Sequence, residues 1–531
     1  MANETSSFGR LSKANQRCIE EEEAVEHFKQ NTYRDEEGRF VVRLPRKDTL
    51  NELGSTMAMA TSRFFSVERK LQHDEKLRTE YTKFINEYIE MKHMVEVVDE
   101  LAIPKPSFYL PHHAVMKTSS LTTKLRVVFD ASATSSSGLS LNNVLKCGPT
   151  VQEDVFGILT RFRKHQFVVT SDVEKMFRQV RVSEKDWNLQ RILWRQNPSE
   201  KLRTYQLTTV TYGTTPASFL ATQCLVALAE EVKEQYSEAS ESILRDFYMD
   251  DLMSGADTVE DCCRIQKEVN SILASAKMPL RKWCSNSQAI IEQMDKHEGD
   301  PLFTLEIGDG EIIKSLGLEW KPLLDQFFFT ISPTLQRKCL TKRIILSALN
   351  KIFDPLGFLA PVLIKGKIFL QQMWAEKMDW DKPLPIAMQT KWSTFYNSLE
   401  QLKVLEIPRK VIPKNIELHG FCDASEEAYG ACIYVRSLDG NGIWSSRLLC
   451  SKTRVAPLKE TTIPRLELNG ALLLAELVNK VSESWGFQLQ SFQLWTDSVV
   501  VLSWINSQKT RLKSYVLNRI SQILELTEAD Q

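Results

Sequence analysis

Two aspartates at the tip of a predicted hairpin are the sharpest chemical feature of this sequence. Asp250 and Asp251 lie between β-rich flanks in the run 247–255, FYMDDLMSG, and such flanks around an acidic pair predict a hairpin that presents both carboxylates. Asp172 ends a second β-rich stretch, 167–172. Taken singly, an Asp-Asp pair favours a plain turn, and a strand-end aspartate favours a helix cap.

If they were grouped together, Asp172, Asp250 and Asp251 would need protons or cations between them. Two charges about 4 Å apart repel by about 4 kcal/mol at an effective dielectric near 20, so closely packed carboxylates either stay protonated or bind divalent ions. In nucleotidyl transfer, paired Mg²⁺ ions activate an attacking hydroxyl and stabilise the leaving pyrophosphate. We therefore predict that these three aspartates are catalytic and bind metal.

A second set of acids consists of Asp423, Glu467 and Asp497. Asp423 follows a predicted strand at 418–422, Asp497 closes another at 492–496, and Glu467 lies in the first turns of a predicted helix. An acid in the first turn also offsets the helix macrodipole, which is the alternative role for Glu467. Glu467 nevertheless lies on the apolar face of this helix, where a carboxylate needs a partner or a metal; that face continues with Ala471, Leu474 and Val478.

The first set resembles the reverse transcriptase of LTR retrotransposons, and most closely that of the Bel-Pao group. The run 171–180, SDVEKMFRQV, is similar to the family's first catalytic motif, and Asp250-Asp251 is similar to its second. The resemblance implies a right-hand polymerase of fingers, palm and thumb that copies RNA into DNA with Mg²⁺, or with Mn²⁺ in its place. It implies as partners an RNA template, a DNA primer, their RNA–DNA hybrid and deoxynucleoside triphosphates.

The same resemblance implies residues that contact the nucleotide and the primer. The run 124–130, KLRVVFD, is similar to a fingers hairpin whose lysine and arginine hold the triphosphate, as a point charge and a bidentate fork; a solvated strand edge is the alternative. Phe177 matches the aromatic that excludes a ribose 2′-hydroxyl, and a core aromatic is its alternative. The run 212–221 is similar to a template-gripping motif, although Ser218 replaces the proline usual before the phenylalanine. The implied nucleotide-binding residues are Lys124, Arg126, Phe177, Tyr212, Gly213 and Lys282, and the implied primer-binding residues are Leu316, Gly317 and Trp320.

The order of the second set, with acids on a strand, at a helix start and at a later strand end, resembles ribonuclease H. In that family the triad and a fourth aspartate bind two metals and cleave the RNA strand of a hybrid, so Asp423, Glu467 and Asp497 are implied to be catalytic and metal-binding. The fourth aspartate follows the 518–520 region by a few tens of residues, whereas this sequence ends at residue 531 and Asp530 lies too early. We therefore expect a C-terminally truncated domain with impaired ribonuclease H activity.

The pattern of elements divides the chain into four predicted parts within an α/β (α+β) fold. Residues 1–103 are predicted as mostly helical, 104–325 as fingers and palm, 326–413 as a helical thumb or connection, and 414–531 as the ribonuclease H-like α/β domain. The third part also resembles Bel-Pao polyprotein. We expect it to grip the duplex through basic side chains, with a solvated helix as the alternative; these are Arg337, Lys338, Lys342 and Arg343.

Two competing functions remain beside a polymerase. The third part carries a peptidase label in the Bel-Pao group, but no Asp-Ser-Gly or Asp-Thr-Gly tripeptide occurs in the sequence, and an aspartic protease holds its paired carboxylates in such loops. Aspartic peptidase activity is therefore not expected. The other alternative is a catalytically decayed or co-opted fragment that binds nucleic acid without copying it.

The composition excludes several classes of protein. The 531 residues are 43% hydrophobic and 25% charged, ordinary proportions that exclude a fully disordered or collagen-like chain. Lys and Arg (67) nearly balance Asp and Glu (68), so any nucleic-acid site must be a local basic patch. Ten cysteines without a Cys-x-x-Cys pair predict reduced thiols in an intracellular, cytoplasmic protein. Neither a signal peptide nor a membrane span is recognisable, and the oligomeric state is not indicated.

Overall fold

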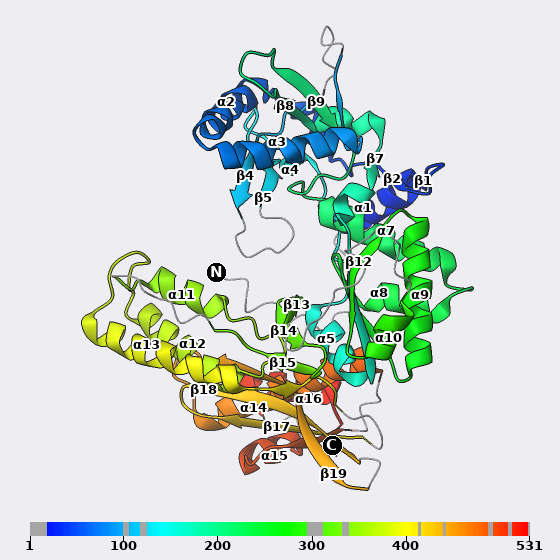
Figure 1. The fold of residues 1–531 in the computed structure, drawn as a ribbon. Coiled ribbons are helices and arrows are strands. Elements are labelled where there is room, and N and C mark those ends of the chain that lie inside the picture. Colours follow the sequence, from blue (N-terminus) through cyan, green and yellow to red (C-terminus); the bar gives the residue numbers. More distant parts are fainter. Residues whose placement is uncertain are drawn as a thin grey trace.

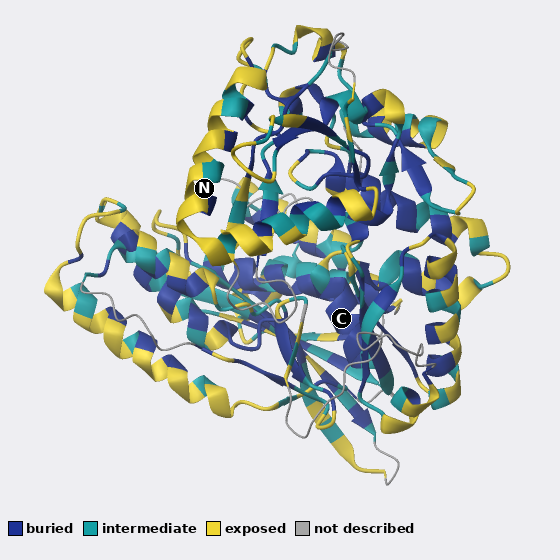
Figure 2. Cartoon of the chain, turned by 45° about the horizontal axis from the view of Figure 1, so that its top comes forward, coloured by how far each residue is buried: buried dark blue, intermediate teal, exposed yellow. Residues whose placement is uncertain are grey.

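The computed structural model of the chain describes residues 19–98, 106–116, 125–294, 312–331, 339–411, 416–438, 442–486, 492–507 and 512–528. Helices and strands occur throughout these ranges, which confirms the predicted mixed α/β character. Figure 1 shows α2 (Met57–His73) and α3 (Glu75–Glu90) at one end of the molecule and α14 (Ile463–Trp485) at the other, with α9 (Val259–Ser275) along one side between them. In Figure 2 the buried residues gather on the sheets and on the inward faces of the helices.

A four-stranded antiparallel sheet, here called the central sheet, positions the first set of acids. Its strand order is β10 (Phe247–Tyr248), β11 (Asp251–Ala256), β6 (Phe167–Val173) and β12 (Leu280–Ser285). Helix α9 packs against it, and so does α5 (Val155–Lys164). Two consecutive helices, α7 (Ala217–Val232) and α8 (Ser237–Arg245), lie beside α9. Because β6 pairs with both β11 and β12, the end of β6 lies at the centre of the sheet edge.

The α2 and α3 helices cover two small sheets. One has the order β3 (Met94–Glu96), β9 (Arg203–Leu207), β8 (Arg191–Trp194), and the other is the hairpin of β4 (His112–Met116) and β5 (Leu125–Phe129). A third sheet of order β1 (Tyr33–Arg34), β2 (Phe40–Val42), β7 (Arg181–Val182) follows α1 (Ile19–Asn31). One hydrophobic core joins buried residues from Ala24 to Met294, so this core crosses the predicted boundary at residue 103.

The short elements of this half complete its chain order. They are the 3₁₀ helices η1 (Asp48–Glu52) and η2 (Glu184–Leu189) and the short helices α4 (Leu141–Val144), α6 (Met176–Gln179) and α10 (Gln288–Gln293). Among them α6 matters for the site, because it directly follows β6 and begins after Lys175, which has a left-handed φ of +51°.

The part predicted as a helical connection is enclosed by strands. Its helices are α11 (Lys342–Asn350), α12 (Ala360–Ala375) and α13 (Ile386–Ser398), followed by the 3₁₀ helix η3 (Leu399–Val404). The strands β13 (Ile313–Ser315), β14 (Leu318–Lys321) and β15 (Gln326–Phe328) precede these helices, and β16 (Ile407–Pro408) follows them. The four strands form one sheet in the order β13, β14, β15, β16. Because β15 pairs with β16, the helical block begins and ends at one place in the fold.

The C-terminal region is a four-stranded sheet with helices. Its order is β19 (Trp444–Val455), β18 (Ala428–Leu438), β17 (Glu417–Ala424), β20 (Phe492–Trp495), and only the β17–β20 pair is parallel. Helix α14 packs on β17 and β18, and α15 (Val499–Ile505) and α16 (Ser514–Leu526) pack on α14. The long strand β19 was not predicted from the sequence.

Two buried arginines connect α5 to the β13–β16 sheet and to the C-terminal sheet. Arg163 donates from Nε to the carbonyl of Arg409 at 2.9 Å and from Nη1 to the carbonyls of Leu448 and Leu449 at 2.8 and 2.6 Å. Arg409 forms an ion pair with Asp325 at 2.6 Å. Burial lowers the pKa of Arg163 to about 9. The helix α5, which packs on the central sheet, is therefore joined to the C-terminal sheet through buried guanidinium groups.

Two further findings concern the environment of the chain. No helix within the described ranges is long and apolar enough to cross a membrane. The cysteines that the structure describes are free thiols; they are Cys147, Cys224, Cys262, Cys263, Cys284, Cys339, Cys422, Cys432 and Cys450.

Candidate active sites: two clusters of carboxylates

The central sheet brings Asp172, Asp250 and Asp251 together. Asp172 near the end of β6 and Asp251 at the start of β11 are register partners on adjacent antiparallel strands. Asp250 occupies the turn between β10 and β11, and its carbonyl accepts the backbone N–H of Val173 at 2.8 Å. The residues that sequence reasoning grouped as the first set thus come from two strands and one turn at the same sheet edge.

The charges in this cluster strongly affect one another. Burial and the neighbouring charges of Asp250 and Asp172 raise the pKa of Asp251 to about 7. Burial and then Asp172 also raise the pKa of Asp250, against the lowering effect of Lys282 and Arg126. Near neutral pH the cluster therefore holds a proton that a divalent cation would displace.

The two carboxylate oxygens of Asp172 differ in their interactions. Its Oδ2 lies 2.9 Å from Lys282 Nζ in an ion pair, whereas its Oδ1 is buried without a hydrogen-bond partner. A buried carboxylate oxygen without a donor is costly and is suited to a hard cation such as Mg²⁺. The three aspartates are not among the described groups whose ligand atoms all lie within 4.8 Å of one another. The donor set fits a divalent cation, with Lys282 as its competitor.

The predicted nucleotide-binding residues lie around this edge. Arg126 on β5 is exposed, and its charge acts on Asp250. Phe177 on α6 meets Tyr212 edge to face, with ring centroids 6.5 Å apart, and the Tyr212 hydroxyl donates to the carbonyl of Val127 at 2.6 Å. Gly213 has a φ of +101°, and a Cβ at this position would overlap the Phe129 carbonyl. Only glycine therefore fits at this position. Lys124 lies outside the described residues.

The predicted primer-binding hairpin is the β13–β14 turn. The backbone N–H of Leu316 binds the Asp251 carboxylate, and Gly317, with φ +81°, packs against the ring of Phe353. Trp320 is only 1% exposed. Its ring packs edge to face on Phe162, with centroids 5.4 Å apart. The prediction that Trp320 contacts a primer is wrong for its side chain, because it belongs to the core under the turn.

The basic residues proposed to grip a duplex are not presented as expected. Lys342 is 2% exposed, and its Nζ lies 3.5 Å from the ring centre of Trp374 and 4.9 Å from that of Trp380. Arg343 forms an exposed ion pair with Asp381 at 2.7 Å. The prediction for Lys342 is wrong, because two indole rings cover its ammonium group. Arg337 and Lys338 lie outside the described residues.

The second set of acids forms the tighter cluster. Each of Asp423, Glu467 and Asp497 offers a carboxylate oxygen, and these atoms all lie within 4.8 Å of one another. Asp423 lies near the end of β17, Asp497 directly after the parallel strand β20, and Glu467 in the first turns of α14. The parallel pairing of β17 with β20 places the two aspartates at the same sheet edge.

Glu467 shows why this cluster fits a metal ion. Its side chain is buried, and its Oε2 has no hydrogen-bond partner. Burial, followed by the charges of Asp423 and Asp497, raises its pKa, and only the Ala424 backbone N–H lowers it. Three converging carboxylates with an unpartnered buried oxygen are a donor set for a hard divalent cation. Asp530, the aspartate considered as a fourth ligand, lies outside the described residues.

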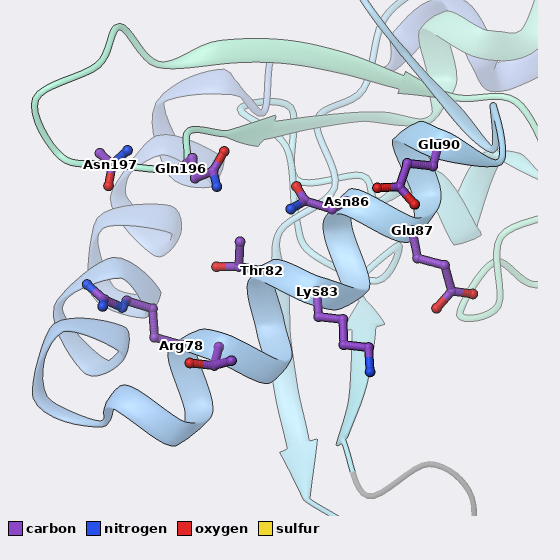
Figure 3. Close-up of a pocket in the computed structure, with 9 residues that line it drawn as sticks. Arg78, Thr82, Lys83, Asn86, Glu87, Glu90, Gln196 and Asn197 are labelled. Carbon is purple, nitrogen blue, oxygen red and sulfur yellow. The ribbon is translucent and has the colours of Figure 1, made fainter.

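A polar cavity of about 580 Å³ lies elsewhere, on α3. Figure 3 shows Asn86 and Glu90 along one side of the helix and Lys83 and Glu87 along another, with Gln196 and Asn197 after β8. Neither carboxylate cluster lines this cavity. Its mixed charges do not indicate a particular ligand, and we assign no function to it.

Sequence reasoning missed one neighbour of the first cluster. Gln152 binds both backbone groups of Met249, the residue before Asp250. Nothing in the run around Gln152 marks it, because a glutamine in a loop before a helix has no characteristic spacing. The ion pair of Lys282 with Asp172 was also not foreseen, although the lysine itself was selected.

The comparison of sequences finds one family. Residues 341–498 match the family described as "Pao retrotransposon-like RNaseH-like domain". This range runs from α11 through β17–β19 to just past Asp497, so it includes all three acids of the second cluster. No curated protein sequence matches the chain.

Solved structures share the fold over most of the chain. The foamy viral protease–reverse transcriptase in complex with an RNA/DNA hybrid matches with a TM-score of 0.53 and 12% identity, covering 85% of this chain and 52% of that one. The same viral protein in complex with double-stranded DNA matches with a TM-score of 0.54 and 13% identity, covering 86% and 82%. This chain thus spans about half the length of the first structure. The family match confirms the predicted retrotransposon resemblance over residues 341–498, and the solved structures show that the fold is shared over most of the chain.

Proposed function

We propose that this Bel-Pao-type pol segment is an RNA-directed DNA polymerase. In this proposal the central sheet is the palm, the region of β4, β5, β8 and β9 is the fingers, and the part from 326 to 413 is the thumb and connection. One observation carries the proposal: Asp172 and Asp251 are register partners at the sheet edge where Asp250 forms the turn. The foamy viral protein of the same fold binds an RNA/DNA hybrid and double-stranded DNA, which supports nucleic acid as the partner.

The reaction is attack of a primer 3′-hydroxyl on the α-phosphate of a deoxynucleoside triphosphate, with release of pyrophosphate. Asp172, Asp250 and Asp251 would hold divalent cations, and these would activate the hydroxyl and stabilise the leaving group. Lys282 leaves Asp172 and binds the phosphates as the nucleotide enters, with the exposed Arg126 beside it.

Two aromatic residues and one backbone turn complete the proposed site. Phe177, braced by the ring of Tyr212, excludes a ribose 2′-hydroxyl and so selects deoxynucleotides. The turn at Leu316 and Gly317 guides the primer end, because the Leu316 N–H already binds the Asp251 carboxylate. Much of the affinity for template and primer comes from phosphate contacts and falls steeply with salt.

Primer extension on an RNA template tests the polymerase assignment. The unmodified chain should add deoxynucleotides to a DNA primer in Mg²⁺ or Mn²⁺, and Asp250→Asn should abolish the addition. Asp257→Asn is the matched control, because Asp257 is an exposed aspartate just beyond β11 and lies outside the cluster. Equal extension by Asp250→Asn and the unmodified chain would contradict the assignment. Template binding without extension by either chain would favour the non-catalytic binder.

A second activity is supported by the tighter carboxylate cluster. We propose that Asp423, Glu467 and Asp497, whose ligand atoms lie within 4.8 Å of one another, bind a divalent cation that would polarise a phosphodiester in the RNA strand of a hybrid. Cleavage of a labelled RNA–DNA hybrid tests this activity. Asp423→Asn should remove any Mg²⁺-dependent cleavage, whereas Asp257→Asn should leave it unchanged. Cleavage that persists in Asp423→Asn would be evidence against this site.

A further inference from the structure

Gln152 binds the backbone of the turn that presents Asp250. Its Oε1 accepts the N–H of Met249 at 2.7 Å, and its Nε2 lies 3.4 Å from the carbonyl oxygen of Met249, to which it donates. One side-chain amide thus satisfies both polar groups of a single peptide residue, as a neighbouring strand would do. Met249 lies in the turn between β10 and β11, where no strand partner supplies these bonds.

The backbone of Met249 is in a conformation that needs such support. Its φ is +54°, in the left-handed region, which is unfavourable for a residue with a Cβ. Conformations of this kind persist where the surroundings fix them. Met249 directly precedes Asp250, so the left-handed residue sets the direction in which the Asp250 carboxylate leaves the turn. On the other side the turn is fixed by the bond from Val173 N–H to the Asp250 carbonyl.

The helix that follows Gln152 holds the base of the same hairpin. Arg161 on α5 binds Asp246 Oδ1 at 3.1 Å, and Asp246 Oδ2 accepts the hydroxyl of Ser254 at 2.7 Å. The carbonyl of Asp246 accepts the N–H of Met253 at 3.0 Å. Gln152 and Arg161 therefore hold the tip and the base of the β10–β11 hairpin from one continuous segment.

That segment is itself anchored to the C-terminal region. Ser484 on α14 donates its hydroxyl to the carbonyl of Gly157 at 2.8 Å, and Thr160 Oγ1 lies 2.8 Å from the hydroxyl oxygen of Ser484. Lys480 and Asp154 form an ion pair at the start of α5. Helix α5 packs on α14 as well as on the central sheet. The start of α5, and with it the end of the loop that carries Gln152, is therefore held in place.

We propose that Gln152 is a positioning residue for the polymerase site: by holding the left-handed Met249, it sets the direction of the Asp250 carboxylate. This inference rests on the proposed polymerase function only for its catalytic consequence. The structural consequence, that Gln152 fixes the turn, stands or fails independently of any activity.

The test combines hydrogen exchange with primer extension on the full chain. In Gln152→Leu, exchange of the Met249 amide should accelerate about fivefold or more, because a net hydrogen bond is worth about 1 kcal/mol. The kcat of primer extension should fall by between about 10- and 100-fold, because misplacing a reacting group by about 1 Å has an effect of this size. The Kd for primer–template should stay within about twofold, since Gln152 makes no phosphate contact in this proposal.

Two further variants keep the result interpretable. Gln152→Glu retains an oxygen that accepts the Met249 N–H, so the slow exchange should return in this variant if the acceptor, and not side-chain volume, is responsible. Gln288→Leu, at an exposed glutamine on α10, should change neither exchange nor extension. Unchanged exchange of the Met249 amide in a folded Gln152→Leu protein overturns the inference. Loss of protection in a chain that never extends primers would instead retain the role of Gln152 and reject the proposed function.

Discussion

Lys282 holds Asp172 by an ion pair in which Nζ lies 2.9 Å from Oδ2. Lys282 itself has a left-handed φ of +56° beside a register shift in the β12–β6 pairing. The irregular backbone of β12 thus directs the Lys282 side chain toward the aspartates of the central sheet. Its ammonium group partly neutralises the cluster and occupies an oxygen that a divalent cation would use.

Replacing this lysine should strengthen metal binding. In Lys282→Gln, the affinity for Mn²⁺ measured by electron paramagnetic resonance should rise by up to about fivefold, because a partly exposed ion pair is worth up to about 1 kcal/mol. Lys277→Gln is the matched control, since Lys277 is an exposed lysine with a similar φ of +57°. Weaker Mn²⁺ binding in Lys282→Gln would show that the lysine supports the metal site and does not compete for it.

The pKa of Asp251 predicts how stability depends on pH without metal. Its value of about 7 in the folded chain lies above the ordinary range near 4, so the folded state holds a proton that the unfolded state releases. In EDTA the stabilisation should be present at low pH and be lost as pH rises from about 4 through 7. Asp251→Asn should flatten this decline in the unfolding midpoint between pH 5 and 8, and Asp257→Asn should not. A decline of equal slope in Asp251→Asn would assign the proton to another group.

The sequence predicted both acid clusters because each depends on local patterns. The acids at 250 and 251 lie between two β-rich flanks, and Asp172 ends a stretch of β-branched residues, so strand and turn signals were enough. Helix α14, whose first turns carry Glu467, continues to Trp485 before Gly486, whose φ is +69°. That glycine is the usual helix stop, so the true end was readable from the sequence.

Other features depend on tertiary packing that local patterns do not contain. Trp320 and Lys342 have side chains typical of nucleic-acid contacts, yet Phe162 and a pair of indole rings bury them. Strand β19 has little alternation of polar and apolar residues, and its pairing with β18 defines it. Gln152 contacts a turn that lies almost a hundred residues away in the sequence, and the residues beside Gln152 do not indicate this contact.

Neutralising Glu467 should separate stability from metal binding in the second cluster. Burial, followed by the charges of Asp423 and Asp497, raises the pKa of this carboxylate, so Glu467→Gln removes a buried charge and its repulsion and should raise the unfolding midpoint in EDTA at pH 8. Mn²⁺ stabilises the chain through preferential binding to the folded state, and the same variant should lose the part of this stabilisation that the second cluster supplies while keeping the part from Asp172, Asp250 and Asp251. Glu483→Gln, at an exposed glutamate on the same helix, should keep both values of the unmodified chain. A full Mn²⁺ shift in Glu467→Gln would exclude Glu467 as a ligand.

Gly357 couples the helical block to the C-terminal sheet, and its substitution should be costly. Its φ is +75°, and an added Cβ would overlap the carbonyl of Ser451 on β19. Ser451 in turn donates its N–H to the Leu356 carbonyl at 2.8 Å and its hydroxyl to the Gly357 carbonyl. Gly357→Ala should lower the free energy of unfolding by about 3 kcal/mol or more, because backbone strain and a clash with fixed backbone add. Gly442→Ala is the control: its φ is +79° but nothing lies within 4 Å of the new methyl group, so it should cost only about 1–2 kcal/mol. Equal losses in chemical denaturation would mean that the left-handed backbone alone, and not the contact with Ser451, requires glycine at 357.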